Sequence, residues 1–157
     1  MDNNNTFMEP KPQYGKRMRM MMSPQGELDS KLCQACYDGD LEEVEKLLDK
    51  GASAKACHDG GWTALHSAAG HGNLDMVMLL VEDGADLNAK NFRNETALHC
   101  ACYCGAADVA IYLVEMGANP KVKDNNGMDC ITFAEQNGHS ALAVDMLAEF
   151  MSATDMD

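Results

Sequence analysis

The chain has few basic residues for its size. Its 157 residues include 12 lysines and arginines against 25 aspartates and glutamates, which gives a net charge of −13. A surface with this excess of negative charge repels phosphate backbones and anionic lipid headgroups. The composition therefore argues against nucleic acid and against a membrane surface as partners.

Long apolar segments are missing as well. The longest apolar runs have about six residues, as at 76–81, whereas a membrane-spanning helix needs about 20 and a signal-peptide core about 7 to 15.

The seven cysteines, an odd number without a secretory signal, indicate reduced thiols rather than a disulfide framework. We therefore expect one soluble domain, a monomer on its own, in the cytoplasm with the nucleus as a second location.

Catalytic signatures are also lacking. The sequence has no glycine-rich phosphate loop, no paired carboxylates in an apolar setting, and no serine or cysteine with an assigned base. We therefore expect neither enzymatic activity nor a cofactor.

The stretch at 1–27 differs from the rest of the chain. It contains three consecutive asparagines, three of the four prolines and no apolar period, which is typical of a disordered arm. The arm also holds the only basic cluster, KRMRMMM at 16–22. A localisation signal and a docking peptide are both open interpretations of this cluster.

Glycines recur with a fixed period in the remainder. Gly39, Gly72, Gly105 and Gly138 are evenly spaced along the chain, with a step of ~33 residues. Small or apolar residues keep the same period, as in Leu32, Leu65, Leu98 and Ile131, or Ala35, Ala68, Ala101 and Ala134. A fixed period of this length indicates a repeat architecture.

One unit shows what each repeat contains. Thr63 has the side-chain oxygen to cap a short helix, and Gly72 suits the left-handed position that ends it. A second helix, ended by Gly84, carries apolar residues at helical spacing: Leu74, Val77, Leu80 and Val81. Two antiparallel helices and a loop cannot cover their apolar faces alone, so we expect the units to stack.

Two stretches resemble ankyrin repeats: TALHSAAGHGNLDMVMLLVEDGADLNA at 63–89 and TALHCACYCGAADVAIYLVEMGANP at 96–120. The resemblance covers about residues 28–150 and implies an all-α solenoid of helix-turn-helix units with β-turn fingers. The expected domains are an arm at 1–27, a repeat domain at 28–151 with units 28–57, 58–90, 91–123 and 124–151, and a flexible tail at 152–157.

The stretch HCACYC, which begins at His99, is unusually rich in sulfur. His99 stands where the family has a histidine that hydrogen-bonds around the loop and the helix start. Cys100 and Cys104 are i, i+4 partners on the open face, and Cys102 points to the opposite side. Structural zinc needs four ligands, and His71 adds only a third, so we expect structural thiols and no metal. A thiol-based redox sensor using Cys100 and Cys104 stays as an alternative.

The resemblance implies a non-enzymatic protein–protein interaction module, acting as adaptor, scaffold or inhibitor. Partners of the family usually lie in the concave surface formed by the loop tips, or fingers, and the first helices, or palm. Large apolar groups there would anchor a partner, and acids there would select a basic segment. The expected contact residues are Tyr37, Asp38, Asp59, Trp62, His71, Phe92, Arg93, Glu95, Tyr103, Cys104, Asn126, Met128, Phe133 and Asn137. A structural subunit of a larger assembly is the second alternative.

Overall fold

The computed structural model describes residues 23–154, except for the side chain of Asp59. This part of the chain forms eight α-helices and one short 3₁₀ turn. The helices are α2 (Pro24–Asp38), α3 (Leu41–Asp49), α4 (Ala64–His71), α5 (Leu74–Glu82), α6 (Ala97–Cys104), α7 (Ala107–Glu115), α8 (Cys130–Gln136) and α9 (Ser140–Thr154), with η1 at Asp59–Gly61. The basic cluster predicted at 16–22 lies outside the described residues.

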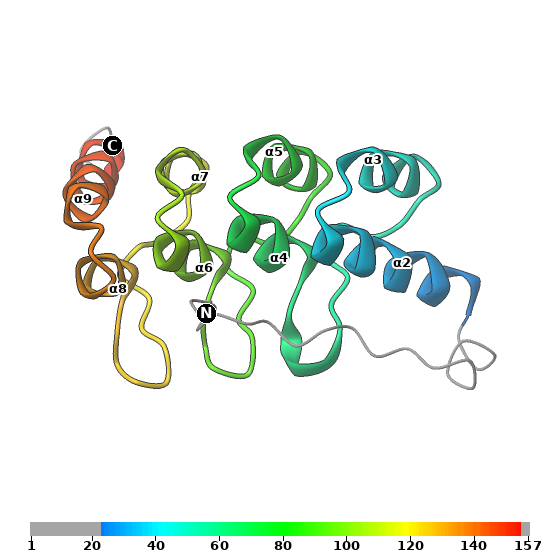
Figure 1. Ribbon diagram of the computed structural model, residues 1–157, viewed down its shortest axis with the longest axis horizontal. Coiled ribbons are helices and arrows are strands. Elements are labelled where there is room, and N and C mark those ends of the chain that lie inside the picture. The colour runs from blue at the N-terminus through cyan, green and yellow to red at the C-terminus, as the bar shows by residue number, and fades with distance from the viewer. Residues whose placement is uncertain (1–22, 155–157) are drawn as a thin grey trace, which may run out of the picture.

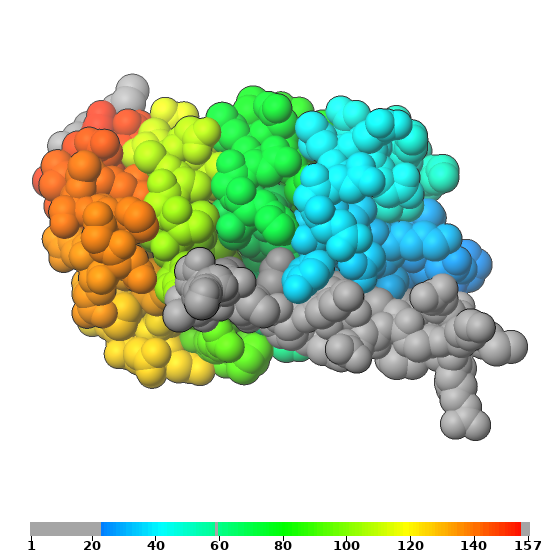
Figure 2. Space-filling model, in the orientation of Figure 1, coloured from blue at the N-terminus to red at the C-terminus, as the bar shows by residue number. Residues whose placement is uncertain are grey.

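The helices form two rows. The first helices of the units, α2, α4, α6 and α8, lie in one row, and α3, α5, α7 and α9 lie in the other, while the connecting loops extend as fingers from the first row (Figure 1). In the space-filling view the units follow one another as adjacent bands of colour (Figure 2). The predicted all-α solenoid is therefore confirmed.

Capping residues set the helix boundaries. Thr63 accepts a hydrogen bond from the His66 amide at 3.2 Å, and α4 ends at Gly72, whose φ of 67° is left-handed. The last unit lacks the threonine, but Asp129 takes its place and accepts from the Thr132 amide at 2.8 Å. The repeat survives this substitution because an aspartate caps a helix as well as a threonine does.

Helices continue past both predicted limits of the repeat domain. Ser23 caps α2 by accepting from the Gly26 amide at 3.1 Å, so residues 24–27 are helical and do not belong to the arm. At the other end α9 continues to Thr154, so residues 152–154 are helical rather than part of a tail. The start of α2 was missed because residues 24–27 show no apolar period.

The periodic residues form the core. Leu32, Leu65 and Leu98 are almost completely buried, and Ala68 and Ala101 let the first helices approach closely. The first helices contact one another more extensively than α3, α5 and α7 do. Within residues 23–154 no helix has the length and apolar character needed to cross a membrane.

Candidate protein-binding surface

Hydrogen bonds tie the fingers to one another. The Phe92 amide donates to the Gly60 carbonyl at 2.7 Å, and the Asn125 amide donates to the Arg93 carbonyl at 2.9 Å. The Asn125 side chain donates to the Phe92 carbonyl at 3.1 Å and accepts from Asn94 at 2.6 Å. Three successive fingers are therefore held in a fixed relation at their tips.

Two histidines fix the bases of the fingers. His66 Nε2 lies 2.8 Å from the Glu95 carbonyl, and His99 Nε2 lies 3.1 Å from the Met128 carbonyl. Each histidine sits on a first helix and binds the loop of the following unit. Burial lowers the pKa of His66 to about 4, so its ring is neutral at physiological pH.

Phe92 is the main exposed apolar group on the fingers, with 58% of its surface accessible. Its ring lies over Gly60, where an added Cβ would come within 2.8 Å of the ring. The Arg93 guanidinium lies 5.2 Å from the ring centre, a cation–π distance. We name Gly60, Phe92, Arg93, Asn94 and Asn125 the tip platform.

The palm contributes a second aromatic pair. Tyr103 and Phe133, from α6 and α8, are half-buried, and their ring centres lie 5.8 Å apart. The His99 and Phe133 rings form a T-shaped pair with their centres 5.7 Å apart. On the other side of the palm, His71 Nε2 lies 2.6 Å from the Tyr37 carbonyl. The first helices are thus linked across the concave face by side chains as well as by their core.

Most of the predicted contact residues reach the surface. The exposed ones are Asp38, His71, Phe92, Arg93, Cys104, Asn126 and Asn137, and the half-buried ones are Tyr37, Tyr103, Met128 and Phe133. The backbone of Asp59 is in η1, at the tip of the finger that also carries Gly60. These residues therefore lie at the surface of the fingers and the palm. Trp62 and Glu95 are buried.

Trp62 is a correction to the predicted surface. Its side chain is completely buried, and its ring packs against His66 in a T-shaped arrangement with the ring centres 5.6 Å apart. The His58 amide donates to the Trp62 carbonyl at 2.9 Å, and a β-bridge pairs Cys57 with Thr63. This narrow hairpin turns the tryptophan inward, so it supports the finger instead of anchoring a partner.

Glu95 is a second correction. It stands one repeat period after Trp62, and only 5% of it is exposed. Its carboxylate accepts from the Asn91 side chain at 3.0 Å, and its amide donates to the same side chain at 3.0 Å. The residue before the capping threonine points inward in both units, so Glu95 cannot select a basic partner.

Cys100 is a third correction, because the sequence placed it on the open face. Cys100 is fully buried, like Cys102, because α6 is packed between α4 and α8. Cys104 reaches the surface, but its partial burial raises the pKa of the thiol, which disfavours the reactive thiolate. A sensor that uses both Cys100 and Cys104 is therefore poorly supported. Within residues 23–154 no three histidines, cysteines or acids are grouped to hold a metal ion.

Asn94 was missed from the sequence. Asn94 has a left-handed φ of 60°, and it stands one repeat period from both Gly61 and Gly127, whose φ values are 76° and 77°. Asparagine tolerates this backbone better than most residues while adding a polar side chain. The period was therefore a signal that could have identified the finger-to-finger contact.

Comparison with known proteins identifies the repeat class. The sequence model of the family described as ankyrin repeats (3 copies) matches residues 32–124, more than half of the chain. The chain belongs to the ankyrin-repeat family. Ankyrin repeats are in general protein–protein interaction modules and are typically non-enzymatic.

One curated relative is similar over a short segment. The 2-5A-dependent ribonuclease of Mus musculus is 54% identical to this chain over 41 residues, which are 26% of this chain and 6% of the ribonuclease. The match thus spans a small part of that protein, and it extends no activity to this chain.

Proposed function

We propose that this chain is a non-catalytic binding protein that holds a protein partner on its concave face, with the tip platform at the centre of the contact. The observation that carries the proposal is the position of Phe92. The residue is 58% exposed although hydrogen bonds to two neighbouring fingers hold its backbone. A preorganised, exposed aromatic ring loses little entropy on binding and is a typical interface anchor.

The surrounding residues suit an interface of ordinary size. Tyr103 and Phe133 extend the apolar surface toward the palm, and Arg93 adds a planar donor beside Phe92. Such an interface covers about 800 Å² on each partner. The net charge of −13, with Asp38 exposed on the palm, favours a partner that carries a basic segment.

The proposed setting is a reducing compartment, the cytoplasm or the nucleus. All seven cysteines are free thiols, which supports this setting. An adaptor, a scaffold or an inhibitor would all use the same surface.

Affinity capture from a lysate of the source cells tests the proposal. The bait would be the wild-type chain, a Phe92→Ala, Tyr103→Ala variant, and a Met116→Ala control. Met116 follows α7 and is 48% exposed, so the control removes a similar apolar group outside the fingers and the palm. We expect partners that the control retains and the double variant loses. The same partners on all three baits would overturn the concave-face proposal.

A further inference from the structure

A groove runs between α3 and α5 in the second row of helices. It consists of two adjoining hollows of about 460 and 340 Å³, which share Glu45, Leu79 and Glu82. The floor and sides are apolar at Leu41, Leu48, Met78 and Leu79, and acidic at Glu45, Asp49, Asp75, Glu82 and Asp83. We name this the α3–α5 groove. It lies in the helix row away from the fingers (Figure 1), so it is distinct from the proposed partner surface.

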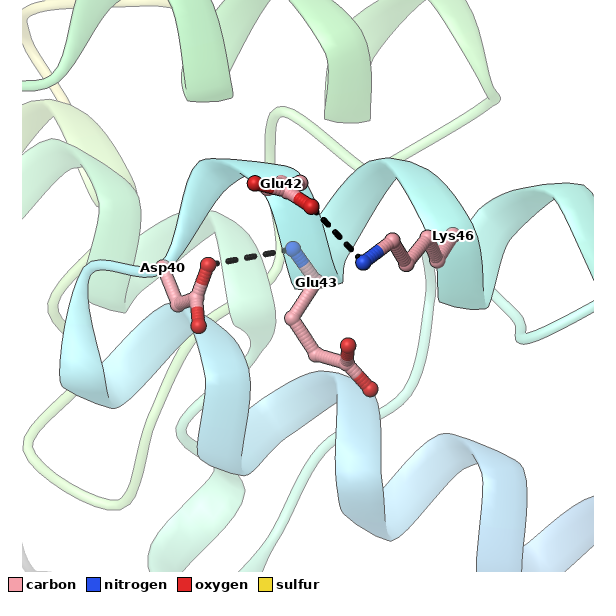
Figure 3. Close-up of polar contacts among 4 residues, drawn as sticks. All are labelled: Asp40, Glu42, Glu43 and Lys46. Carbon is pink, nitrogen blue, oxygen red and sulfur yellow. Dashed lines mark hydrogen bonds and ion pairs between the residues drawn. The ribbon is translucent and has the colours of Figure 1, made fainter.

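The negative charge of the groove is uncompensated within the described residues. No basic residue is among those lining it, and none of its five acids forms an ion pair with a residue of 23–154. The lysine on α3, Lys46, is bound to Glu42 at 2.8 Å (Figure 3). Asp40 in the same view caps the helix by accepting from the Glu43 amide at 3.1 Å. The groove therefore suits an occupant that supplies positive charge and apolar side chains together.

The chain contains one segment with this chemistry. Residues 16–22, KRMRMMM, have three basic side chains and four methionines and no acid. Methionine is unbranched and adapts to irregular apolar surfaces such as the leucines and methionine of the groove. This segment is the only basic cluster in a chain of net charge −13.

The segment is also tethered close to the groove. Helix α2 begins at Pro24, and the Gln25 side chain donates to the Gly51 carbonyl at 3.0 Å. Gly51 is two residues after Asp49, which lines the groove at the C-terminal end of α3. In Figure 1 α2 begins at the outer edge of the stack, beyond α3, so the segment would approach the groove from this end of α3. Arg19 precedes Pro24 by five residues, a reach of at most about 18 Å. The segment can therefore reach the end of the groove at Asp49 without a long loop.

We propose that residues 16–22 dock in the α3–α5 groove of the same molecule. The basic side chains pair with the acids of the groove, and the methionines cover its apolar floor. A short tether gives an effective concentration in the millimolar range, so the contact needs little intrinsic affinity. The groove is then a site for basic, methionine-rich peptides that the chain itself occupies.

Amide NMR spectra of the intact protein test this proposal. We compare the wild type with a Lys16→Glu, Arg17→Glu, Arg19→Glu variant and expect the shifts to change at Leu48, Leu79 and neighbouring groove residues, not at Asn125. The variant loses three surface charge pairs of ordinary strength. The ratio of docked to open form should therefore fall about tenfold. Raising NaCl from about 0.05 to 0.5 M should produce the same changes in the wild type, because salt screens exposed charges.

A charge exchange supplies the matched control. The Glu45→Lys, Glu82→Lys substitutions should restore docking when they are combined with the acidic arm variant. Glu115→Lys should not, because Glu115 is exposed, stands one repeat period after Glu82, and lies on α7 outside the groove.

Three results would overturn the proposal. Groove resonances that are the same in the wild type and the arm variant would show that the arm is not docked. Changes centred on the fingers would place it elsewhere. Groove shifts that grow with protein concentration would show that the occupant is the arm of a second copy. Circular dichroism confirms that each variant is folded.

Discussion

His66 holds two loops at once. Its Nδ1 accepts the Thr63 amide hydrogen at 3.2 Å, and its Nε2 lies 2.8 Å from the Glu95 carbonyl. Because a carbonyl can only accept, Nε2 carries the hydrogen and Nδ1 is unprotonated. A second proton would break the bond from Thr63 in a fully buried site.

We predict that stability falls as the pH drops from about 6.5 to about 4. Burial lowers the pKa of His66 from 6.5 to about 4 in the folded protein, so protons bind the unfolded chain first in this range. His66 should account for a loss of about 2 to 3 kcal/mol between pH 7 and about pH 4.5. Urea unfolding at both pH values measures it.

The matched variant for this prediction is His66→Gln, which cannot titrate. It should be less stable at pH 7 but lose less stability on acidification than the wild type does. Equal losses in the two proteins would contradict the lowered pKa of His66. The comparison cancels the contributions of the remaining acids and histidines.

Truncation should destabilise the protein far more at Trp62 than at Phe92. Trp62→Ala should destabilise the protein by about 3 to 5 kcal/mol, because it empties a buried site. Phe92→Ala removes an exposed ring and should cost less than about 1 kcal/mol. Urea unfolding followed by circular dichroism measures both values. A small loss for Trp62→Ala would return the tryptophan to the list of surface anchors.

At the scale of the element, the repeat period predicted where the helices lie, but it did not predict which side chains reach the surface. The glycines that recur once in each period mark the ends of helices, and Leu65 and Leu98 are buried as their positions predict. The direction of Trp62 depends on the hairpin from Cys57 to Thr63, which a period does not reveal. The burial of Cys100 depends on helices on both sides of α6, whereas the helical wheel describes one helix alone.

The burial of the cysteines predicts which thiols react in the folded protein. With DTNB at pH 7, two of the seven cysteines, Cys57 and Cys104, should react in the folded protein, because the other five are buried. Cys104 should react slowly, because its partial burial raises the pKa of the thiol. All seven should react in denaturant. Cys57→Ser and Cys104→Ser should each remove one native equivalent.

The same titration separates structural thiols from a redox sensor. A sensor requires Cys100 to react in the folded state at a rate close to that of an exposed thiolate. Rapid modification that is lost in Cys100→Ser would contradict the burial seen in the structure and restore the sensor as a function.

At the scale of the whole molecule, the two rows of helices have different surfaces. The finger side presents a fixed aromatic ring at Phe92, whereas the second row presents an acidic groove between α3 and α5. A partner bound to the fingers, as proposed, would leave the groove accessible, because the two surfaces belong to different rows of helices.

The C-terminal end of the stack, formed by α9, is the candidate surface for self-association. Val144 and Met151 on α9 are 65% and 53% exposed and face away from the buried Leu142 and Met146. The terminal units of a solenoid usually have a polar outer face, so these side chains suggest a neighbour at the stack end. Against this, scattered exposed apolar residues are normal on monomers, and a stable interface needs about 800 Å² on each side.

We predict a monomer whose melting temperature does not change with protein concentration. Adding Val144→Glu and Met151→Glu should alter the free energy of unfolding by less than about 0.5 kcal/mol, because both side chains are exposed. Sedimentation and thermal unfolding over a hundredfold concentration range, about 1 to 100 µM, measure both properties, since self-association makes melting concentration-dependent. A wild type that self-associates and a variant that does not would make the stack end an interface, and the protein would then be a subunit of a larger assembly.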